Sequence, residues 1–240
     1  RIKIDPSESG VYIVYQTLLG PTNNQIIFSK RTMTGVQVLS PINLTANAFN
    51  LITPDIFITD DFLLYIVWHN VGTTAIQYQV FNDIGVSQGA AIVISASTQH
   101  VGFGTLVNGA LKPRIIVAQN KDIYASFLQD KGAGVYGLSI WTDGAAKLLD
   151  LTAPGENITS YDIIVEDIYN SIIVDLVQAA SVDVVNFLNE TVLFSLNLLA
   201  AASQGVSLVK DALGSLLHIY SSAPSGAFTS YDATTSVTDI

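Results

Sequence analysis

An apolar strand that ends in an aromatic residue, a polar turn, and a second strand that ends in another aromatic residue follow one another five times along the chain. The paired positions lie 13, 13, 14, 11 and 11 residues apart, and the unit recurs every 44 to 59 residues. The pairs are Tyr15/Phe28, Trp68/Phe81, Phe127/Trp141, Leu176/Phe187 and Tyr220/Tyr231, with Leu176 as the one member that is not aromatic. A unit repeated at such a period indicates a repeat architecture, in which each unit buries its apolar faces against its neighbours.

The composition is that of a packed protein with few charges. Of the 240 residues, 49% are hydrophobic and 12% are charged, so disorder is excluded and Ser, Thr, Asn and Gln must cover much of the surface. A net charge of −10 argues against nucleic acid as a partner, because phosphates require clustered Lys and Arg. The chain has no cysteine, which excludes disulfides and thiol chemistry. No apolar stretch reaches the ~18 residues that a membrane span needs, so we expect none.

Three features favour an extracellular location, or one on a virion or cell surface. The chain begins at Arg1 and not at Met, which predicts a processed mature protein or a fragment of a longer chain. N-x-[ST] sequons at Asn43, Asn157 and Asn189 are candidate glycosylation sites, and all three fall in segments that we expect to connect strands. The low content of charged residues is the third feature.

Each unit predicts four short strands. The first strand of each unit, called the inner strand, is a run rich in Ile and Val, which is typical of a strand buried on both faces. Asn, Asp and Gly in the turn after the second aromatic position favour a hairpin, because they adopt positive φ and bond to their own backbone. The inner strands are predicted at residues 2–4, 56–58, 115–117, 163–165 and 206–209, the second strands at 11–15, 64–68, 123–127, 172–176 and 216–220, and the fourth strands at 36–39, 91–95, 146–151, 192–198 and 236–240.

Five four-stranded meanders in succession resemble a five-bladed β-propeller, and the resemblance covers the whole chain. It rests on spacing, because neither a Trp-Asp dipeptide nor an S-x-D-x-G-x-x-W Asp box is present. We expect an all-β chain with negligible helix, forming one domain over residues 1–240 with blades at about 1–50, 51–110, 111–160, 161–203 and 204–240. The aromatic pairs should then pack between blades. A β-sandwich or jelly roll is the alternative, although it gives no reason for five aromatic pairs.

Two motif matches and three histidines do not predict chemistry. Residues 85–89 fit G-x-S-x-G and residues 132–137 fit G-x-G-x-x-G. Both lie in predicted hairpins, whereas a nucleophile elbow and a dinucleotide-binding loop each lead into a helix. His69, His100 and His218 are far apart in the sequence and form no metal-binding pair. We therefore expect neither a metal nor a cofactor.

The carboxylates divide into two sets once the repeats are aligned. One set recurs in the first hairpin of every unit, as expected for turn residues, and consists of Asp5, Asp60, Asp61, Asp122, Glu166, Asp167 and Asp211. In the other set, Asp55 and Asp162 stand immediately before the inner strands of units two and four, and Arg114 has the matching place in unit three. In a propeller, residues at these positions rim one mouth of the axial channel.

Long connections are expected on the same face as this mouth. Residues 95–112, which include His100 and Asn108, exceed the usual length of a connection, and long loops in compact domains are commonly functional. Residues 16–25 and 40–53 are the other long segments. We therefore predict a ligand-binding set made of Asp55, Arg114, Asp162, His100 and Asn108.

The leading hypothesis is an extracellular or surface-exposed propeller that binds a glycan or a protein through the loops between blades. It would act alone or in a larger extracellular or virion-like assembly of like or unlike chains. The absence of a catalytic motif argues against an enzyme. The alternative is a glycoside hydrolase, because five-bladed propellers often resemble such enzymes, and Asp55 and Asp162 would then be its catalytic carboxylates. A pure scaffold without a ligand is the third interpretation.

Overall fold

The chain is all-β. The computed structural model describes residues 1–4, 6–7, 9–18, 24–45, 51–73, 75–94, 113–130, 135–143, 147–150, 158–166, 171–178, 181–186, 191–197, 203–210, 216–222 and 228–232. Side chains are described as far as Ile164, with gaps, and the backbone alone beyond it. Within these ranges there is no helix, and so none with the length and hydropathy needed to cross a membrane.

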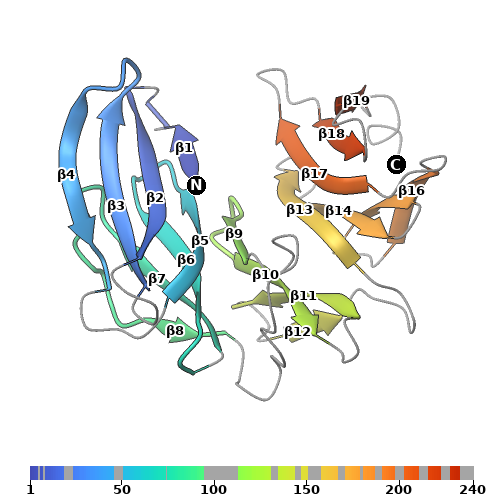
Figure 1. Cartoon of the computed structure of the whole chain (residues 1–240), viewed down its shortest axis with the longest axis horizontal. Helices are drawn as coiled ribbons and strands as arrows, with labels where there is room; N and C mark the ends of the chain where they lie inside the picture. The colour runs from blue at the N-terminus through green and yellow to red at the C-terminus, as the bar shows by residue number, and fades with distance from the viewer. Residues whose placement is uncertain are drawn as a thin grey trace.

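The described strands form five antiparallel sheets, which follow one another in sequence order. Their strands are β1 (Ile2–Ile4), β2 (Gly10–Leu18), β3 (Asn24–Thr32) and β4 (Gln37–Asn43); β5 (Leu51–Ile58), β6 (Leu64–Asn70), β7 (Ala75–Phe81) and β8 (Ile92–Val93); β9 (Arg114–Val117), β10 (Ile123–Asp130), β11 (Tyr136–Thr142) and β12 (Lys147–Asp150); β13 (Ile158–Glu166), β14 (Ser171–Gln178), β15 (Ser181–Asn186) and β16 (Thr191–Asn197); and β17 (Ser203–Lys210), β18 (Leu216–Ser222) and β19 (Phe228–Asp232). In each sheet consecutive strands pair, so the chain runs as a meander. The sheets succeed one another in an arc, with β1, β5, β9 and β13 toward its inner side (Figure 1).

The predicted order of strands is confirmed wherever the structure describes it, but several strand ends are corrected. β2 and β3 pair as far as Leu18 and Asn24, so much of the expected loop at 16–25 is strand. β4 extends to Asn43 and β5 begins at Leu51, which shortens the expected connection at 40–53. Apolar runs underestimate the length of these strands, because the hydrogen bonds between strands join backbone groups whatever side chains the residues carry. β8 is only two residues long, and the predicted strand at 236–240 lies outside the described residues.

Four hairpin turns share one geometry, at residues 32–36, 59–63, 82–86 and 118–122. In each, the N–H of the first residue donates to the carbonyl of the fifth, and the N–H of the fourth donates to the carbonyl of the first. In three of them a side-chain oxygen of the first residue, Thr32, Thr59 or Asn82, also accepts the N–H of the fifth. The fourth residue has positive φ in all four: Gly35 (85°), Phe62 (60°), Gly85 (80°) and Lys121 (74°).

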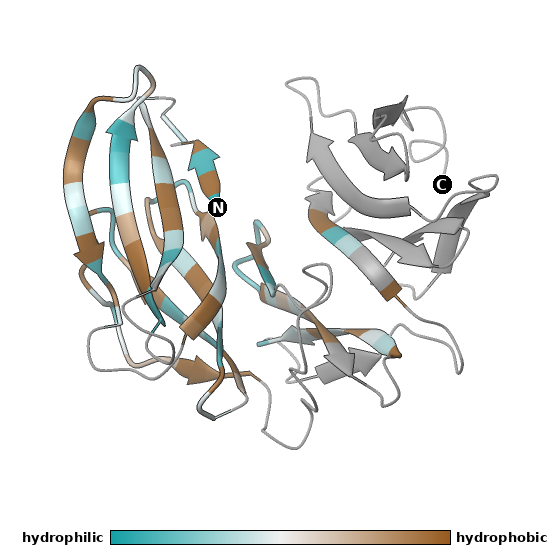
Figure 2. Ribbon diagram, in the orientation of Figure 1, coloured by the Kyte–Doolittle hydropathy of each residue, from teal (hydrophilic) through white to brown (hydrophobic). Residues whose placement is uncertain are grey.

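Three clusters of buried apolar side chains lie between neighbouring sheets, joining the first sheet to the second, the second to the third and the third to the fourth. Side chains alternate between the two faces of a strand, so Ile66 and Trp68 pack toward the first sheet while Val67 packs toward the third. Hydrophobic residues accordingly recur along the strands of these sheets (Figure 2). Each fully buried side chain contributes roughly 1.5 to 3 kcal/mol. The interfaces between sheets therefore supply much of the apolar stabilisation.

The aromatic pairs follow the expectation only in part. Phe28, Trp68, Phe81 and Phe127 are at most 2% exposed and pack between sheets, which confirms their predicted role. Tyr15, in contrast, is 39% exposed. It lies on β2 in the first sheet, whose two faces differ in burial.

The expectation that every inner strand is buried on both faces is wrong for β1. Ile2 and Ile4 are 65% and 57% exposed. The physical reason is the alternation of side chains along the strand: Lys3 pairs with Tyr12, which packs on the second sheet, so Ile2 and Ile4 lie on the other face of the first sheet. One face of the first sheet therefore presents apolar side chains that the described residues do not cover.

Candidate functional site

The inner strands place one residue from each sheet at an equivalent position. This residue pairs with the one immediately before the first aromatic position of its unit. The five are Arg1 (opposite Val14), Asp55 (opposite Val67), Arg114 (opposite Ser126), Asp162 (opposite Asp175) and Ser207 (opposite Ile219), and we call them the axial row. Charge alternates along the row from cation to anion, twice, before the neutral serine.

Ion pairs link the four charged members of the axial row. Arg1 Nε lies 3.3 Å from Asp55 Oδ1. Arg114 Nη1 lies 3.7 Å from the same oxygen, and its Nη2 lies 3.4 Å from Asp162 Oδ1. The side chains of Arg114 and Asp162 are each 14% exposed and that of Arg1 is 35% exposed. Arg114 thus bridges carboxylates from the second and fourth sheets, and the row opens partly to solvent.

A β-bulge sets the position of Asp55. Ile52 pairs with His69 and Asp55 with Val67, so β5 has one residue more than β6 over this interval. Within the bulge, Thr53 has a φ of 51°, which is costly for a β-branched residue, and Pro54 offers no N–H to the ladder. Bulges of this kind redirect the side chains that follow them. The strained residue Thr53 therefore lies two positions before Asp55, the carboxylate that contacts both arginines of the axial row.

Asp55 is almost entirely shielded from water. Its side chain is 7% exposed, and its Oδ2 accepts the N–H of Ile115 at 3.3 Å. Oδ1 has no hydrogen bond within the described part of the chain, so the nearby guanidinium nitrogens of Arg1 and Arg114 hold it by charge. Burial raises the pKa of Asp55 above its ordinary value, while the charges of Arg1 and Lys3 act in the opposite direction. The effect of burial on the pKa is larger than that of the nearby charges, because the buried carboxylate loses most of its hydration.

The buried side chain of Tyr161 lies between the third and fourth sheets, near the axial row. Its hydroxyl donates to the carbonyl of Ser126 at 3.0 Å. Burial raises the pKa of Tyr161 well above its usual value, and the bond to Ser126 opposes that rise. The phenol therefore stays protonated and joins the third sheet to the fourth.

The structure brings together three of the five predicted ligand-binding residues, namely Asp55, Arg114 and Asp162. The other two, His100 and Asn108, lie outside the described residues. The sequence prediction missed Arg1 and Ser207, although Arg1 precedes a short Ile-rich run in the sequence as its three charged counterparts do. The structure corrects the expected strand starts, because Asp55 and Asp162 lie within β5 and β13 and Arg114 is the first residue of β9. Only the strand register places Ser207, because a bulge between Ser203 and Gly205 shifts β17.

The sequons and the histidines need separate comment. Asn43 was expected in a connection, but it is the last residue of β4, where its amide donates to Gln25 and its Oδ1 accepts the N–H of Thr45. Asn157 and Asn189 lie outside the described residues. His69 is fully buried in β6, one residue before the end of that strand. In the described ranges, no three His, Cys, Asp or Glu residues are grouped so as to hold a metal ion.

The serine of the G-x-S-x-G match is a turn residue. Ser87 Oγ accepts a hydrogen bond from Gln79 Nε2 at 2.7 Å and donates to the carbonyl of Gly89 at 2.6 Å. It follows the hairpin at 82–86 and leads toward β8, with no helix between. The local structure therefore matches the hairpin prediction and lacks the geometry of a nucleophile elbow.

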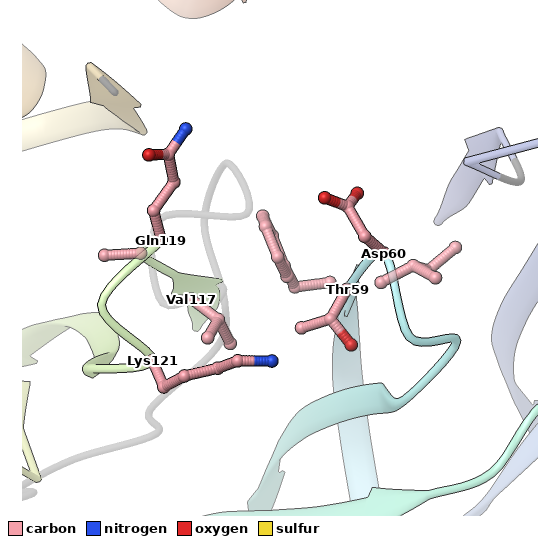
Figure 3. A pocket seen from close by; sticks show the side chains of 8 residues that line it. Thr59, Asp60, Val117, Gln119 and Lys121 are labelled. Atoms are coloured by element: carbon pink, nitrogen blue, oxygen red, sulfur yellow. The ribbon is translucent and has the colours of Figure 1, made fainter. Parts of the chain in front are cut away.

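A cavity of about 340 Å³ lies away from the axial row, at the far ends of β5 and β9. Thr59 and Asp60 form one wall, and Val117, Gln119 and Lys121 form the other (Figure 3). Inner strands run from the axial row to this cavity, so the two features mark opposite ends of the same strands. No local pattern marks the cavity, because its walls come from hairpins about 60 residues apart in the sequence.

No protein-family model matches the chain, and no curated protein is significantly similar to it. Solved structures do share its fold. A protein of unknown function from Dyadobacter fermentans aligns with a TM-score of 0.69 at 7% identity, over 99% of this chain and 79% of the other. An endo-arabinase from Bacteroides thetaiotaomicron aligns with a TM-score of 0.54 at 10% identity, over 96% and 72%.

A third similar structure is the complex of the fission yeast SREBP-SCAP binding domains, with a TM-score of 0.53 at 14% identity, over 96% of this chain and 60% of the other. At these identities the likeness shows the fold alone, which is that of a β-propeller. The three structures include an enzyme and a complex of binding domains. Function must therefore be argued from the site.

Proposed function

We propose that this chain is a five-bladed β-propeller that recognises a carbohydrate at the axial row. The observation that carries the proposal is the convergence of Arg1, Asp55, Arg114 and Asp162, of which Arg114 and Asp162 are partly exposed. A guanidinium beside a carboxylate presents hydrogen-bond donors and acceptors in a fixed geometry, which suits the neighbouring hydroxyls of a sugar. The likeness of fold to an endo-arabinase adds support.

Recognition without hydrolysis is favoured by the state of the two carboxylates. Arg114 contacts both Asp55 and Asp162, and the row as a whole balances two guanidinium groups with two carboxylates. A glycosidase needs one carboxyl group as proton donor and a second that is free to act as base or nucleophile. Because the two guanidinium groups neutralise the two carboxylates, the arrangement suits binding better than proton transfer.

The proposal is tested by screening the purified chain against a glycan array and measuring the best-bound glycan by calorimetry. We expect Arg114→Lys and Asp162→Asn each to weaken binding about ten-fold or more, because each removes charge-assisted hydrogen bonds. Asp83→Asn is the matched control, since Asp83 is exposed in the turn at 82–86. Absence of binding to any glycan, or equal affinity in all four proteins, would reject the proposal.

A glycoside hydrolase is the second candidate. The raised pKa of Asp55 is the observation in its favour, because a general acid must hold its proton near neutral pH. Asp162, on the other side of Arg114, would be the second carboxylate. Release of the aryl group from a panel of aryl glycosides, lost in Asp55→Asn, would support this candidate. A wild-type chain that turns over none of the panel would exclude it from those substrate classes.

Two further parts of the proposal concern architecture and setting. The five sheets would be the blades of one domain over residues 1–240, with the fifth packed on the exposed face of the first.

The chain would act outside the cell or on a virion or cell surface, glycosylated at Asn43, Asn157 or Asn189. Mass measurement of the secreted chain before and after enzymatic deglycosylation tests the setting. Light scattering tests for assembly into oligomers, and pull-down with residues 95–112 deleted tests for a protein partner of that loop.

A further inference from the structure

The cavity between the second and third sheets has the form of a binding site. Hairpins 59–63 and 118–122 border it on two sides, and its walls combine apolar and polar groups. Phe57, Ile58, Val117 and Ala118 supply the apolar surface, and Asp60, Gln119 and Lys121 supply charged or amide groups. Ligand sites commonly occupy about 300 to 1,000 Å³ and combine these two kinds of surface. At about 340 Å³, this one has room for a single sugar ring with bound water.

Two polar side chains at the cavity are not used by the fold. Within the described part of the chain, neither the Asp60 carboxylate nor the Gln119 amide takes part in any hydrogen bond or ion pair. They come from opposite walls (Figure 3). Asp60 offers acceptors only, whereas Gln119 offers both a donor and an acceptor. A ligand that lies between them must therefore supply at least one donor to Asp60.

Lys121 lines the cavity from a hairpin with a specific local structure. Its φ of 74° lies in the left-handed region that non-glycine residues seldom adopt. From there its Nζ reaches Asp61 Oδ2 of the neighbouring sheet at 3.3 Å. Bonds from Thr59 and from Lys121 keep the pKa of Asp61 below its usual value, so this carboxylate stays charged. The ion pair links the two hairpins across the cavity, and neither Asp60 nor Gln119 takes part in it.

The balance of charge selects among possible ligands. The two hairpins carry three carboxylates, Asp60, Asp61 and Asp122, and one ammonium group, Lys121. This excess of negative charge disfavours phosphates, carboxylates and acidic sugars. A neutral sugar ring presents hydroxyl donors at its edge and a C–H face that packs on apolar side chains such as Phe57. These properties match both the polar rim and the apolar walls.

We propose that this cavity, lined by Phe57, Asp60 and Gln119, is a subsite for one neutral sugar residue, separate from the axial row. It rests on the proposed function, because it assigns a second contact point to a carbohydrate-binding chain. Asp60 accepts hydrogen bonds from ring hydroxyls, Gln119 bonds to a further hydroxyl, and Phe57 packs on the ring face. Binding would place sugar residues at both ends of the inner strands.

The test is nuclear magnetic resonance of the ¹⁵N-labelled full chain, titrated with methyl glycosides of neutral hexoses and pentoses. We expect shifts at the amides of residues 57–60 and 117–121 that saturate with sugar. Asp60→Ala and Gln119→Ala should each weaken this binding about three- to ten-fold, as the loss of one or two hydrogen bonds predicts. Both side chains are exposed, so both variants should fold. Asp83→Asn is again the matched control.

Other outcomes separate this inference from the proposed function. Shifts confined to Arg114, Asp162 and their neighbours would overturn the cavity site and leave recognition at the axial row intact. Shifts confined to residues 57–60 and 117–121 would support the cavity site and count against the axial row. Saturable shifts at the cavity with N-acetyl-lysine amide or N-acetyl-arginine amide, but with no sugar, would overturn the assignment to sugar and indicate a basic protein segment as the occupant.

Discussion

Arg114 holds two carboxylates that come from different sheets, and all three side chains are largely shielded from water. Removing one member of such a network leaves a buried charge without compensation, which costs about 3 to 5 kcal/mol. We therefore expect Arg114→Met to lower the free energy of unfolding by about that amount, measured by urea denaturation. Lys121→Met is the comparison, because it breaks an ion pair of similar length in the open. It should change stability little, and equal losses in the two variants would refute a special role for burial.

The raised pKa of Asp55 makes stability depend on pH in a defined direction. Because its pKa is higher in the folded than in the unfolded chain, the folded state binds more protons between the two values. The free energy of unfolding therefore falls as pH rises from about 4, the ordinary carboxyl value, through the raised pKa. Measured by urea denaturation, the stability of the wild type relative to Asp55→Asn should decline over that rise. A relative stability that increases with pH would show that the arginines, and not burial, dominate.

The residues of the axial row were predictable to different degrees. Asp55, Arg114 and Asp162 each precede an Ile-rich run, and that pattern is local. Arg1 fits the same pattern, because it precedes the run at residues 2–4, so an alignment of the repeats that included it would have found it. Ser207 could not be placed, because it interrupts the apolar run of its strand and a bulge changes the count. The ion pairs themselves join residues of different sheets, which no local pattern encodes.

At the scale of elements, the turn at 82–86 does more than reverse the chain. A Cβ atom added at Gly85 would lie 3.2 Å from Ile42 Cδ1 and 3.3 Å from Phe28 Cδ1, so this turn of the second sheet packs on the first. Gly35 occupies the same turn position with a similar φ, and a Cβ there would meet nothing within 4 Å. The two glycines therefore share a backbone requirement and differ in their surroundings.

Alanine substitutions at these two glycines should separate strain from packing. Gly35→Ala should cost about 1 kcal/mol, which is the penalty of the left-handed conformation for a residue with a Cβ. Gly85→Ala should cost more, by about 1 to 2 kcal/mol, because neighbouring side chains must also move. Thermal or urea unfolding of both variants measures the difference. Equal losses would show that the turn does not bear on the packing of the two sheets.

The strands could be predicted where their apolar character is continuous, and less well where it is not. The core segments of β6 and β10 follow directly from alternating apolar residues that face two different neighbours. The ends of β2 and β3 could not be found this way, since Gln16, Thr17 and Gln25 contribute backbone bonds and no apolar signal. The short β8 was overestimated for the opposite reason, because apolar residues extend beyond its two paired positions.

For the whole molecule, the repeat predicted successive sheets because each unit is local in sequence. Whether the fifth sheet meets the first depends on contacts between opposite ends of the chain, which a repeat does not specify. The apolar residues of β1 continue the pattern by which the other sheets pack on their neighbours. A closed ring would bury them, and an open arc would leave them in water.

Stability measurements can decide between these two arrangements. If the ring is closed, Ile2→Thr combined with Ile4→Thr should lower the free energy of unfolding by about 2 kcal/mol, because two apolar side chains would lose burial. Ile92→Thr combined with Val93→Thr is the matched control on β8, an outer strand whose residues are exposed in either arrangement. In an open arc, both double variants should have the same small effect on the urea midpoint. A loss specific to β1 would place the fifth sheet against the first.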